Sequence, residues 1–280
     1  MNPISLRTLL QSLLIFHSRG PSELDVLLED TGVSRRRAKE IIDELVRLGL
    51  LQRTESLITC TLLGEKFVNA LKNSEWPSLH DILVNKCREY QSVIHVLREA
   101  REGIGLTLSE ICLRSSNYGI SINVVIGEVC IEWGIRLGVI QKNLYTTSFR
   151  SRYYYVQNES VALSEFRKIL LEQYKHLNFT RSGHNLMYVS IPELREAICE
   201  ALRLRREIFD RFFEKLYVSE SSVIELSGGP LTGTARKAPT KKLSIFIDRK
   251  SLIMAPKLAL EAQEGFRFRG RVYQMVAFYL

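Results

Sequence analysis

Arg47-Leu48-Gly49-Leu50-Leu51-Gln52-Arg53 recurs 89 positions later as Arg136-Leu137-Gly138-Val139-Ile140-Gln141-Lys142, and this repeat sets the organisation of the chain. Each copy follows an apolar-periodic segment that predicts a long helix. The glycine suits the left-handed conformation that commonly ends a helix, and the apolar pair after it is typical of a strand. We therefore predict a duplicated helix exit into a strand, within an array of small modules.

The composition is that of a soluble globular protein. The 280 residues are 45% hydrophobic and 25% charged, which suits two or three domains of ordinary size. Residues 1–7 lack a signal-peptide layout, and no uncharged apolar run reaches the length of a membrane span. We expect a cytoplasmic protein without a membrane partner.

The sequence gives no sign of a metal site, a disulfide framework or a catalytic motif. The cysteines are odd in number and widely spaced, without a Cys-x-x-Cys pair: Cys60, Cys87, Cys112, Cys130 and Cys199. Gly228 to Gly233 has the spacing of a phosphate loop, but Thr234-Ala235 stands where Lys-Ser/Thr is required. The five histidines are too far apart for a local metal motif. We expect no cofactor, no metal and no enzymatic activity.

The first 78 residues predict three helices followed by a hairpin. An apolar helix over 4–16 is followed by a helix that opens at Pro21-Ser22. After a Thr31-Gly32-Val33-Ser34 turn, Ser34 caps a third helix. This third helix carries an apolar stripe of Ala38, Ile41, Ile42 and Leu45. Strands are predicted at 50–53 and 57–61, and a closing helix at 63–71.

This element order, with the Thr-Gly-Val-Ser turn and the Leu-Gly-Leu-Leu exit, resembles the winged-helix superfamily of DNA-binding domains over residues 4–71. The resemblance implies that the third helix lies in the DNA major groove and that the hairpin contacts the backbone or the minor groove.

The same order predicts two further modules. Residues 79–158 form the second, with strands at 139–145 and 152–156, and residues 159–280 form a divergent third. In the third module, strands are expected at 223–226, 243–247, 252–254 and 266–278. The predicted fold is therefore mainly α with short β-hairpins (α+β), in tandem winged-helix modules with a basic, β-rich C-terminal segment.

The third helix of the first module begins with a cluster of cations. Because its N-terminal half would approach DNA, we expect Arg36, Arg37 and Lys39 to contact the duplex, with Arg35 behind them and Arg53 on the hairpin. The alternative is a solvated face in which Arg36 pairs with Glu40 and Lys39 with Asp43. Four cations at a helix N-terminus oppose the helix dipole, which favours the functional interpretation.

The second module lacks these cations. The repeat aligns Arg35, Arg36 and Lys39 with Val124, Val125 and Glu128. Since its third helix is apolar around most of its circumference, we expect it to pack against a neighbouring module or a second copy of the chain. The predicted interface residues are Val124, Ile131 and Ile135. The hairpin residues Lys142, Arg150 and Arg152 could contact phosphate or stand in solvent.

The net charge of +8 is concentrated near the C-terminus. Residues 226–280 hold ten basic and three acidic side chains. A loop with Arg236, Lys237, Lys241 and Lys242 is expected to order on nucleic acid. Arg267, Arg269 and Arg271 share the parity of one strand, which predicts a row of guanidinium groups about 7 Å apart. A solvated basic surface or a protected sheet edge is the alternative.

These patterns together predict a non-catalytic protein that binds double-stranded DNA, in transcription regulation or another task associated with the nucleoid or chromosome. A homodimer or a protein partner is expected through the second module. Two alternatives stay open, a winged-helix protein-interaction scaffold within a larger complex and an RNA-binding protein.

Overall fold

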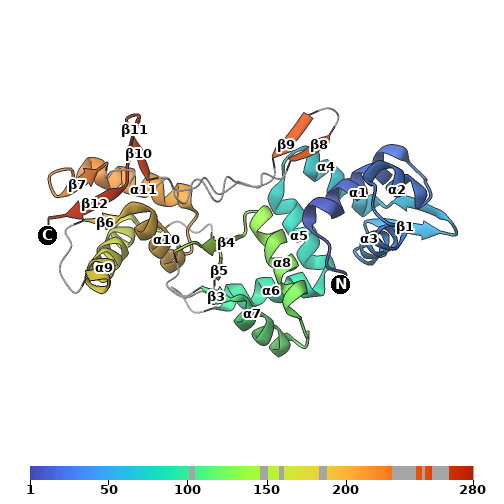
Figure 1. Ribbon diagram of the computed structural model, residues 1–280, viewed down its shortest axis with the longest axis horizontal. Helices are drawn as coiled ribbons and strands as arrows, with labels where there is room; N and C mark the ends of the chain where they lie inside the picture. Colours follow the sequence, from blue (N-terminus) through green and yellow to red (C-terminus); the bar gives the residue numbers. More distant parts are fainter. Residues whose placement is uncertain are drawn as a thin grey trace. The chain divides into compact units, whose positions relative to one another are not determined.

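The computed structural model describes residues 1–100, 105–145, 151–157, 161–182, 188–228, 244–247, 250–253 and 265–279. Over these ranges the chain is mainly helical with small antiparallel sheets, so the predicted α+β class is confirmed (Figure 1). None of the helices in the described ranges has both the length and the apolar character that crossing a membrane requires.

The chain packs as two compact units. Unit 1 comprises Met1–Glu99, Leu108–Ile140 and Lys242–Pro256, and unit 2 comprises Ala100–Thr107, Gln141–Lys241 and Lys257–Leu280. The helices of the predicted second module thus belong to unit 1, and most of its strand residues belong to unit 2. The module boundaries predicted at residues 78 and 158 come from the sequence repeat and differ from the boundaries of the two compact units. These modules remain a prediction.

Unit 1 is built from eight helices of the described chain and two hairpins. The helices are α1 (Leu6–Arg19), α2 (Asp25–Thr31), α3 (Arg35–Arg47), α4 (Leu62–Lys72), α5 (Trp76–Lys86), α6 (Arg88–Glu99), α7 (Leu108–Ser115) and α8 (Val124–Arg136). The hairpins are β1 (Leu51–Thr54) with β2 (Leu57–Cys60) and β8 (Ser244–Ile247) with β9 (Lys250–Ile253). The predicted strands at 50–53 and 57–61 are confirmed by the first hairpin.

The Ser34 cap of α3 and the glycine exits of α3 and α8 have the predicted geometry, and the Asn123 cap of α8 was not predicted. Ser34 Oγ accepts a hydrogen bond from the Arg37 amide at the start of α3, and Asn123 Oδ1 accepts one from the Ile126 amide at the start of α8. Gly49 and Gly138 follow the two helices with φ of 72° and 73°. The duplicated helix exit is therefore confirmed, since α3 and α8, and likewise β1 and β4 (Ile140–Asn143), are offset by the same 89 residues.

The apolar stripe of α3 fixes which side of this helix faces outward. Ala38, Ile41, Ile42 and Leu45 are all buried, as predicted. They share the unit 1 core with the buried leucines and Phe16 of α1, against which α3 packs. Their burial leaves the opposite side of α3, with its cations, at the surface.

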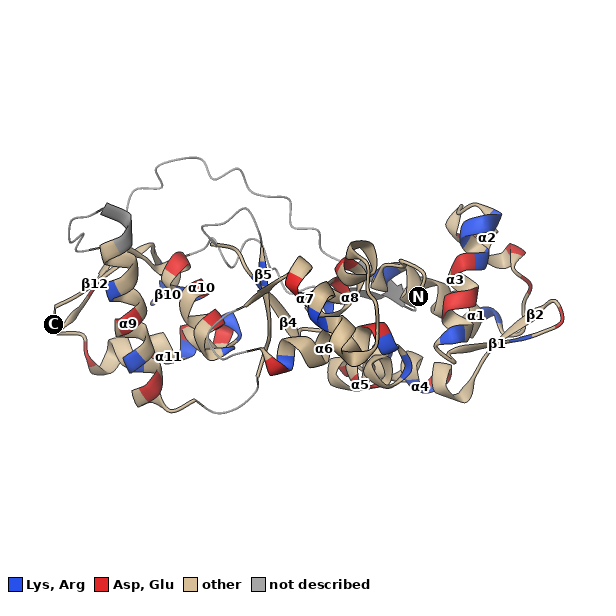
Figure 2. Ribbon diagram, turned by 90° about the horizontal axis from the view of Figure 1, so that it is seen from below, with Lys and Arg blue, Asp and Glu red and all other residues tan. Residues whose placement is uncertain are grey.

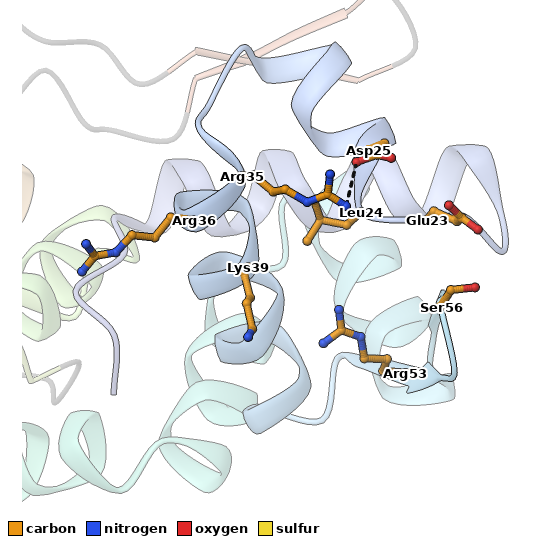
Figure 3. A pocket seen from close by; sticks show the side chains of 8 residues that line it. All are labelled: Glu23, Leu24, Asp25, Arg35, Arg36, Lys39, Arg53 and Ser56. Carbon is orange, nitrogen blue, oxygen red and sulfur yellow. Dashed lines mark ion pairs between the residues drawn. The ribbon is translucent and has the colours of Figure 1, made fainter.

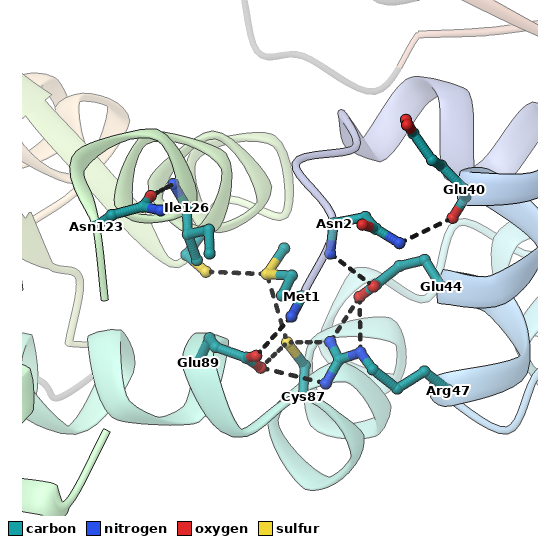
Figure 4. Close-up of polar contacts among 10 residues, drawn as sticks. Met1, Asn2, Glu40, Glu44, Arg47, Cys87, Glu89, Asn123 and Ile126 are labelled. Carbon is teal, nitrogen blue, oxygen red and sulfur yellow. Dashed lines mark hydrogen bonds and ion pairs between the residues drawn. The ribbon is translucent and has the colours of Figure 1, made fainter. Parts of the chain in front are cut away.

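Residues 1–6 run between α3, α6 and α8 and join them through polar contacts (Figure 4). The buried carboxylate of Glu44 accepts hydrogen bonds from the Asn2 amide at 2.9 Å and from Arg47 Nη2 at 2.5 Å. Arg47 also pairs with Glu89, whose Oε1 lies 3.0 Å from the Met1 amino nitrogen. The orientation of α3 is thus fixed at its C-terminal end.

Helix α8 also contacts this N-terminal segment. Trp133 Nε1 donates to the Ile4 carbonyl oxygen at 3.0 Å, and the Leu6 amide donates to Glu132 at 3.1 Å. Packing inside unit 1 buries only part of α8, from Gly127 to Gly134, whereas Val124 and Val125 in its first turn are exposed.

Unit 2 contains three helices of the described chain, two three-stranded sheets and a hairpin. The helices are α9 (Leu163–Ser182), α10 (Ile191–Leu202) and α11 (Arg206–Ser219). One sheet has the order β3 (Leu106–Thr107), β5 (Arg152–Tyr155), β4, and the other the order β6 (Val189–Ser190), β12 (Met275–Phe278), β7 (Ile224–Ser227). The hairpin pairs β10 (Phe266–Phe268) with β11 (Arg271–Tyr273).

The single strand predicted over 266–278 is wrong. Arg269 and Gly270 have positive φ of 47° and 79° and form a two-residue turn between β10 and β11. A turn of this kind is typical of a tight hairpin, and the alternating pattern of Phe and Arg does not reveal it. Arg271 therefore pairs with Phe268 across the hairpin rather than lying in one row with Arg267.

One order of elements occurs three times along the chain: helix, short strand, helix, helix, strand, strand. The last strand lies between the other two in β3-β5-β4 and in β6-β12-β7. In the first copy, Ser22 forms an isolated bridge to Ile58 of β2, which gives the same arrangement. In the third copy the central strand of the sheet is β12, which pairs with β7 although the two strands lie far apart in the sequence.

Gly64 allows α4 to pack closely on the exit from α3. A Cβ atom at this position would lie 2.2 Å from the Leu50 carbonyl oxygen and 2.6 Å from Cys60 Sγ. We expect Gly64→Ala to lower the free energy of unfolding by about 1–3 kcal/mol, because the backbone must shift to admit the methyl group. Urea denaturation measures this loss. The exposed neighbour Glu65→Ala is the control, and equal stability of the two variants would contradict the assignment.

Burial of His80 makes stability depend on pH. Its Nδ1 lies 2.9 Å from the Tyr90 hydroxyl oxygen, and burial lowers the pKa of His80 from 6.5 to about 4, against a smaller opposite effect of Asp81. The folded state keeps the ring neutral, whereas the unfolded chain takes up a proton below pH 6.5. The stability present above pH 6.5 is therefore lost as pH falls towards 4, by up to about 1.4 kcal/mol per pH unit.

Urea denaturation between pH 4 and pH 7 tests this dependence. His80→Gln is expected to flatten the slope relative to the wild type, and His17→Gln is expected to leave it unchanged. An identical slope in wild type and His80→Gln would assign the pH dependence to other groups.

Candidate nucleic-acid interface

The first turns of α3 present cations to solvent. The side chains of Arg35 and Arg36 are 76% and 91% exposed, and Lys39 is exposed one turn after Arg35. The Ser34 cap fixes the start of the helix, and the buried stripe fixes its rotation. The backbone therefore holds these three side chains on one face.

The hairpin β1–β2 adds Arg53 to this face. A hollow of about 490 Å³ lies between α2, α3 and the hairpin. Figure 3 shows Arg35 and Lys39 of α3 and Arg53 of β1 around it, whereas Arg36 lines its edge and its side chain extends away from the other three. It is lined by Glu23, Leu24, Asp25, Arg35, Arg36, Lys39, Arg53 and Ser56. We call these four cations the α3 face.

The ion pairs of the α3 face are exposed, and two of them are longer than 3.5 Å. Arg35 lies 3.7 Å from Asp25, Arg53 lies 3.9 Å from Asp43, and Arg36 Nε lies 3.3 Å from Glu40. Such exposed pairs contribute little to stability and exchange readily for another anion. Of the two ion pairs expected for a solvated face, the pair of Arg36 with Glu40 is present. Lys39 forms no salt bridge with a described carboxylate.

Arg37 lies away from the α3 face. It donates to Glu40 at 2.8 Å and to the Pro3 carbonyl oxygen at 2.9 Å, so it connects α3 to the N-terminal segment. The hydrogen bond from Arg37 lowers the pKa of Glu40, with a further contribution from Arg36. The sequence ranked Arg37 above Arg35 as a DNA contact, whereas the structure groups Arg35 with Arg36 and Lys39.

Acidic side chains limit the extent of the basic surface around α3. Figure 2 shows basic and acidic positions along α3, and the charged residues of α2 are all acidic: Asp25, Glu29 and Asp30. The hairpin tip carries Glu55 and Ser56, both exposed, rather than a cation. Among the residues of β1 and its tip, Arg53 is therefore the one suited to a phosphate.

The equivalent positions in the other two copies have different chemistry. In α8 they are Val124, Val125 and Glu128, and the two valines are 52% and 53% exposed. In α11 the first residue, Arg206, is only 5% exposed. It pairs with Glu196 at 2.5 Å and donates to the Lys142 carbonyl oxygen at 2.8 Å. Of the three described helices in this place, α3 presents an exposed basic face.

The other predicted DNA contacts are dispersed. Lys142 is half-buried on β4, and Arg152 on β5 pairs with Glu200 at 3.3 Å. The side chains of Arg267, Arg269 and Arg271 are exposed around the β10–β11 turn, where the Arg269 guanidinium lies 5.2 Å from the centre of the Phe268 ring. The predicted contacts outside the described residues are Arg150, Arg236, Lys237, Lys241 and Lys242.

The predicted protein-interface residues differ in exposure. Val124 is exposed, Ile135 is half-buried and Ile131 is buried inside unit 1. Ile131 is thus not available to a second chain. The sequence missed this because a helix that is apolar on most sides does not show which of its sides packs inside its own unit.

A second hollow, of about 200 Å³, lies within unit 2 between α9, α10 and the ends of β4 and β5. Its lining mixes both charges: Asn143, Tyr145, Arg152, Gln173, His176, Leu177, Glu193, Ala197, Glu200 and Ala201. Glu200 already accepts hydrogen bonds from the Gly105 amide and from Asn143, and it pairs with Arg152. Within the described ranges, no group of three His, Cys, Asp or Glu side chains is placed to hold a metal ion.

Comparison with known proteins does not identify the chain: no protein-family model matches it, and no curated protein matches it as a relative.

Proposed function

We propose that the chain is an array of three winged-helix modules and that it binds double-stranded DNA through the α3 face. The observation that carries the proposal is the cluster of Arg35, Arg36, Lys39 and Arg53 around one hollow, on a helix whose opposite side is buried. A helix in the major groove contacts DNA with its N-terminal half, and this is where the α3 cations lie.

The weak pairing of these cations supports the proposal. A phosphate that displaces Asp25 from Arg35 or Asp43 from Arg53 breaks only exposed ion pairs longer than 3.5 Å. The phosphate gains charge-assisted hydrogen bonds and releases counterions from DNA. Arg35 and Arg53 would contact the backbone, and Arg36 and Lys39 would approach base edges. This role is non-catalytic and suits transcription regulation or another chromosome-associated task.

Replacing two of these cations tests the proposal. We expect Arg35→Ala with Arg53→Ala to weaken duplex binding by about tenfold or more and to lower the salt slope by about two contacts, because the two cations that would contact the phosphate backbone no longer release counterions. Fluorescence anisotropy with a random-sequence duplex at several salt concentrations measures both effects.

The matched control is Lys66→Ala with Lys86→Ala, which removes the same charge from exposed positions on α4 and α5. Equal losses of duplex affinity in the two double variants would show that net charge alone, rather than the α3 face, determines binding. Undetectable duplex binding by the wild type at low salt would refute the proposal, and preference for single-stranded RNA would favour the RNA-binding alternative.

Glu40 restrains two cations of α3, so its removal should strengthen binding. Glu40 accepts hydrogen bonds from Arg36 and Arg37, and the Arg37 bond lowers the pKa of Glu40. We expect Glu40→Gln to tighten duplex binding by about two- to fivefold, because one nearby acid is removed and Arg36 is released.

The control is Glu65→Gln, an exposed acid on α4. A gain confined to Glu40→Gln supports a local effect at the α3 face, whereas weaker binding of Glu40→Gln would mean that its ion pairs position Arg36 for the duplex.

The protein-interaction scaffold is the second candidate. It is favoured by one observation, the exposure of Val124 and Val125 at the place where α3 carries cations.

A further inference from the structure

The β10–β11 hairpin of unit 2 exposes arginine side chains around a tight turn (Figure 1). Arg267, Arg269 and Arg271 are all exposed, and no acidic residue occurs between positions 265 and 280. Within the described part of the chain, neither Arg269 nor Arg271 forms a salt bridge with a carboxylate. The charges of these two side chains are therefore not neutralised inside the fold.

The hairpin is an addition to the third copy of the element order. It lies between β7 and β12, whereas β1 and β2, the corresponding strands of the first copy, are joined by Glu55 and Ser56 alone. The sheet β6-β12-β7 is formed without the strands of this hairpin. Its arginines are thus not needed to build the repeated fold.

Phe268 positions two of the arginines. Phe268 and Arg271 are directly opposite in the register, so their side chains leave the same face of the hairpin with Cβ atoms about 5 Å apart. The Arg269 guanidinium lies 5.2 Å from the centre of the Phe268 ring, within the range of a cation–π contact. Arg267 is opposite Val272, on the other face. Arg269 and Arg271 therefore lie together beside one ring.

The turn between the strands indicates that Arg269 is present for its side chain. Arg269 and Gly270 have φ of 47° and 79°, in the left-handed region. Such turns prefer Asn-Gly or Asp-Gly, because most other side chains strain the backbone in this conformation. Backbone strain of this kind is typical of functional sites. The hairpin thus accepts strain to hold a guanidinium group at its tip.

The phenylalanine rings of the hairpin are already used inside unit 2. Phe266 is buried and packs edge-on against Phe213, with ring centres 4.9 Å apart. Phe268 packs edge-on against Tyr217 at 5.1 Å and carries Arg269 over its ring. Single-stranded nucleic acids bind largely by stacking bases on exposed aromatic rings. The hairpin instead presents guanidinium groups, which suit the phosphate oxygens of a duplex.

We propose that the β10–β11 hairpin, through Arg269 and Arg271, binds the phosphate backbone of double-stranded DNA as a second contact that does not depend on base sequence. The inference rests on the proposed function in requiring that the chain binds a duplex, but it uses a different unit and none of the α3 residues. Phosphate contacts supply affinity, whereas contacts to base edges select the sequence. Unit 2 therefore strengthens binding, and the α3 face of unit 1 approaches the bases.

Replacing both arginines without disturbing the turn tests the proposal. Arg269→Asn keeps a residue that tolerates positive φ, and Arg271→Gln removes the second charge. We expect the double variant to bind a duplex about fivefold or more weakly, with a salt slope lower by about two contacts and equal losses for duplexes of different sequence. Fluorescence anisotropy over a salt series measures these effects. Unchanged affinity would overturn the proposal.

The matched control is Lys168→Gln with Lys175→Gln, which removes the same charge from exposed positions on α9 of the same unit. Equal losses in the two double variants would overturn the proposal, because net charge would then explain the effect. Losses confined to particular sequences would assign the arginines to base reading and overturn the backbone contact. Tighter binding of single-stranded RNA than of duplex, lost with the two arginines, would overturn the choice of DNA.

Two further measurements keep the outcomes separate. Thermal melting by circular dichroism verifies folding, and Arg271→Gln alone, which leaves the turn untouched, is expected to lower the salt slope by about one contact. A loss in the hairpin variant with unchanged binding of Arg35→Ala with Arg53→Ala would refute the α3 face alone. The reverse result would refute the hairpin contact alone.

Discussion

The candidate site depends on the left-handed glycine exit from α3. Gly49, with φ of 72°, turns the chain so that β1 and β2 fold back beside the helix, and only in this conformation does Arg53 reach the hollow with Arg35, Arg36 and Lys39. The Leu50 amide donates to the Leu45 carbonyl oxygen across this turn, and Gly64 lets α4 pack on the Leu50 carbonyl oxygen without a clash. A side chain at Gly49 would strain the turn and move the hairpin.

The three copies of the element order use the same helix in different ways. In α3 the outward positions are cationic, in α8 they are apolar, and in α11 the first cation is buried against Glu196 and the end of β4. Burying Arg206 is tolerated because both of its Glu196 contacts and the Lys142 carbonyl satisfy the guanidinium. A shared backbone arrangement thus supports three surfaces, and the function of each follows from its side chains rather than from the fold.

Local signals made much of the fold predictable. Caps, glycines and helical stripes act over a few residues, so the α3 stripe, the first hairpin and the offset of 89 residues could be inferred. The Arg269-Gly270 turn was missed because it interrupts a pattern that fits a continuous strand. The roles of Arg37 and Trp133 depend on residues 1–6, which lie far from both in sequence, and periodicity carries no information about such contacts.

The sequence by itself determined that the chain repeats one helix exit, that α3 is amphipathic and basic at its start, and that α8 lacks the corresponding cations. Tertiary structure decided which of those cations share a surface. Arg35 and Arg53 meet Arg36 and Lys39 because the hairpin folds back along α3, and Arg37 is drawn away because the Pro3 carbonyl lies within hydrogen-bonding distance. Short-range propensities fix where an element begins and ends, whereas long-range packing fixes what its side chains face.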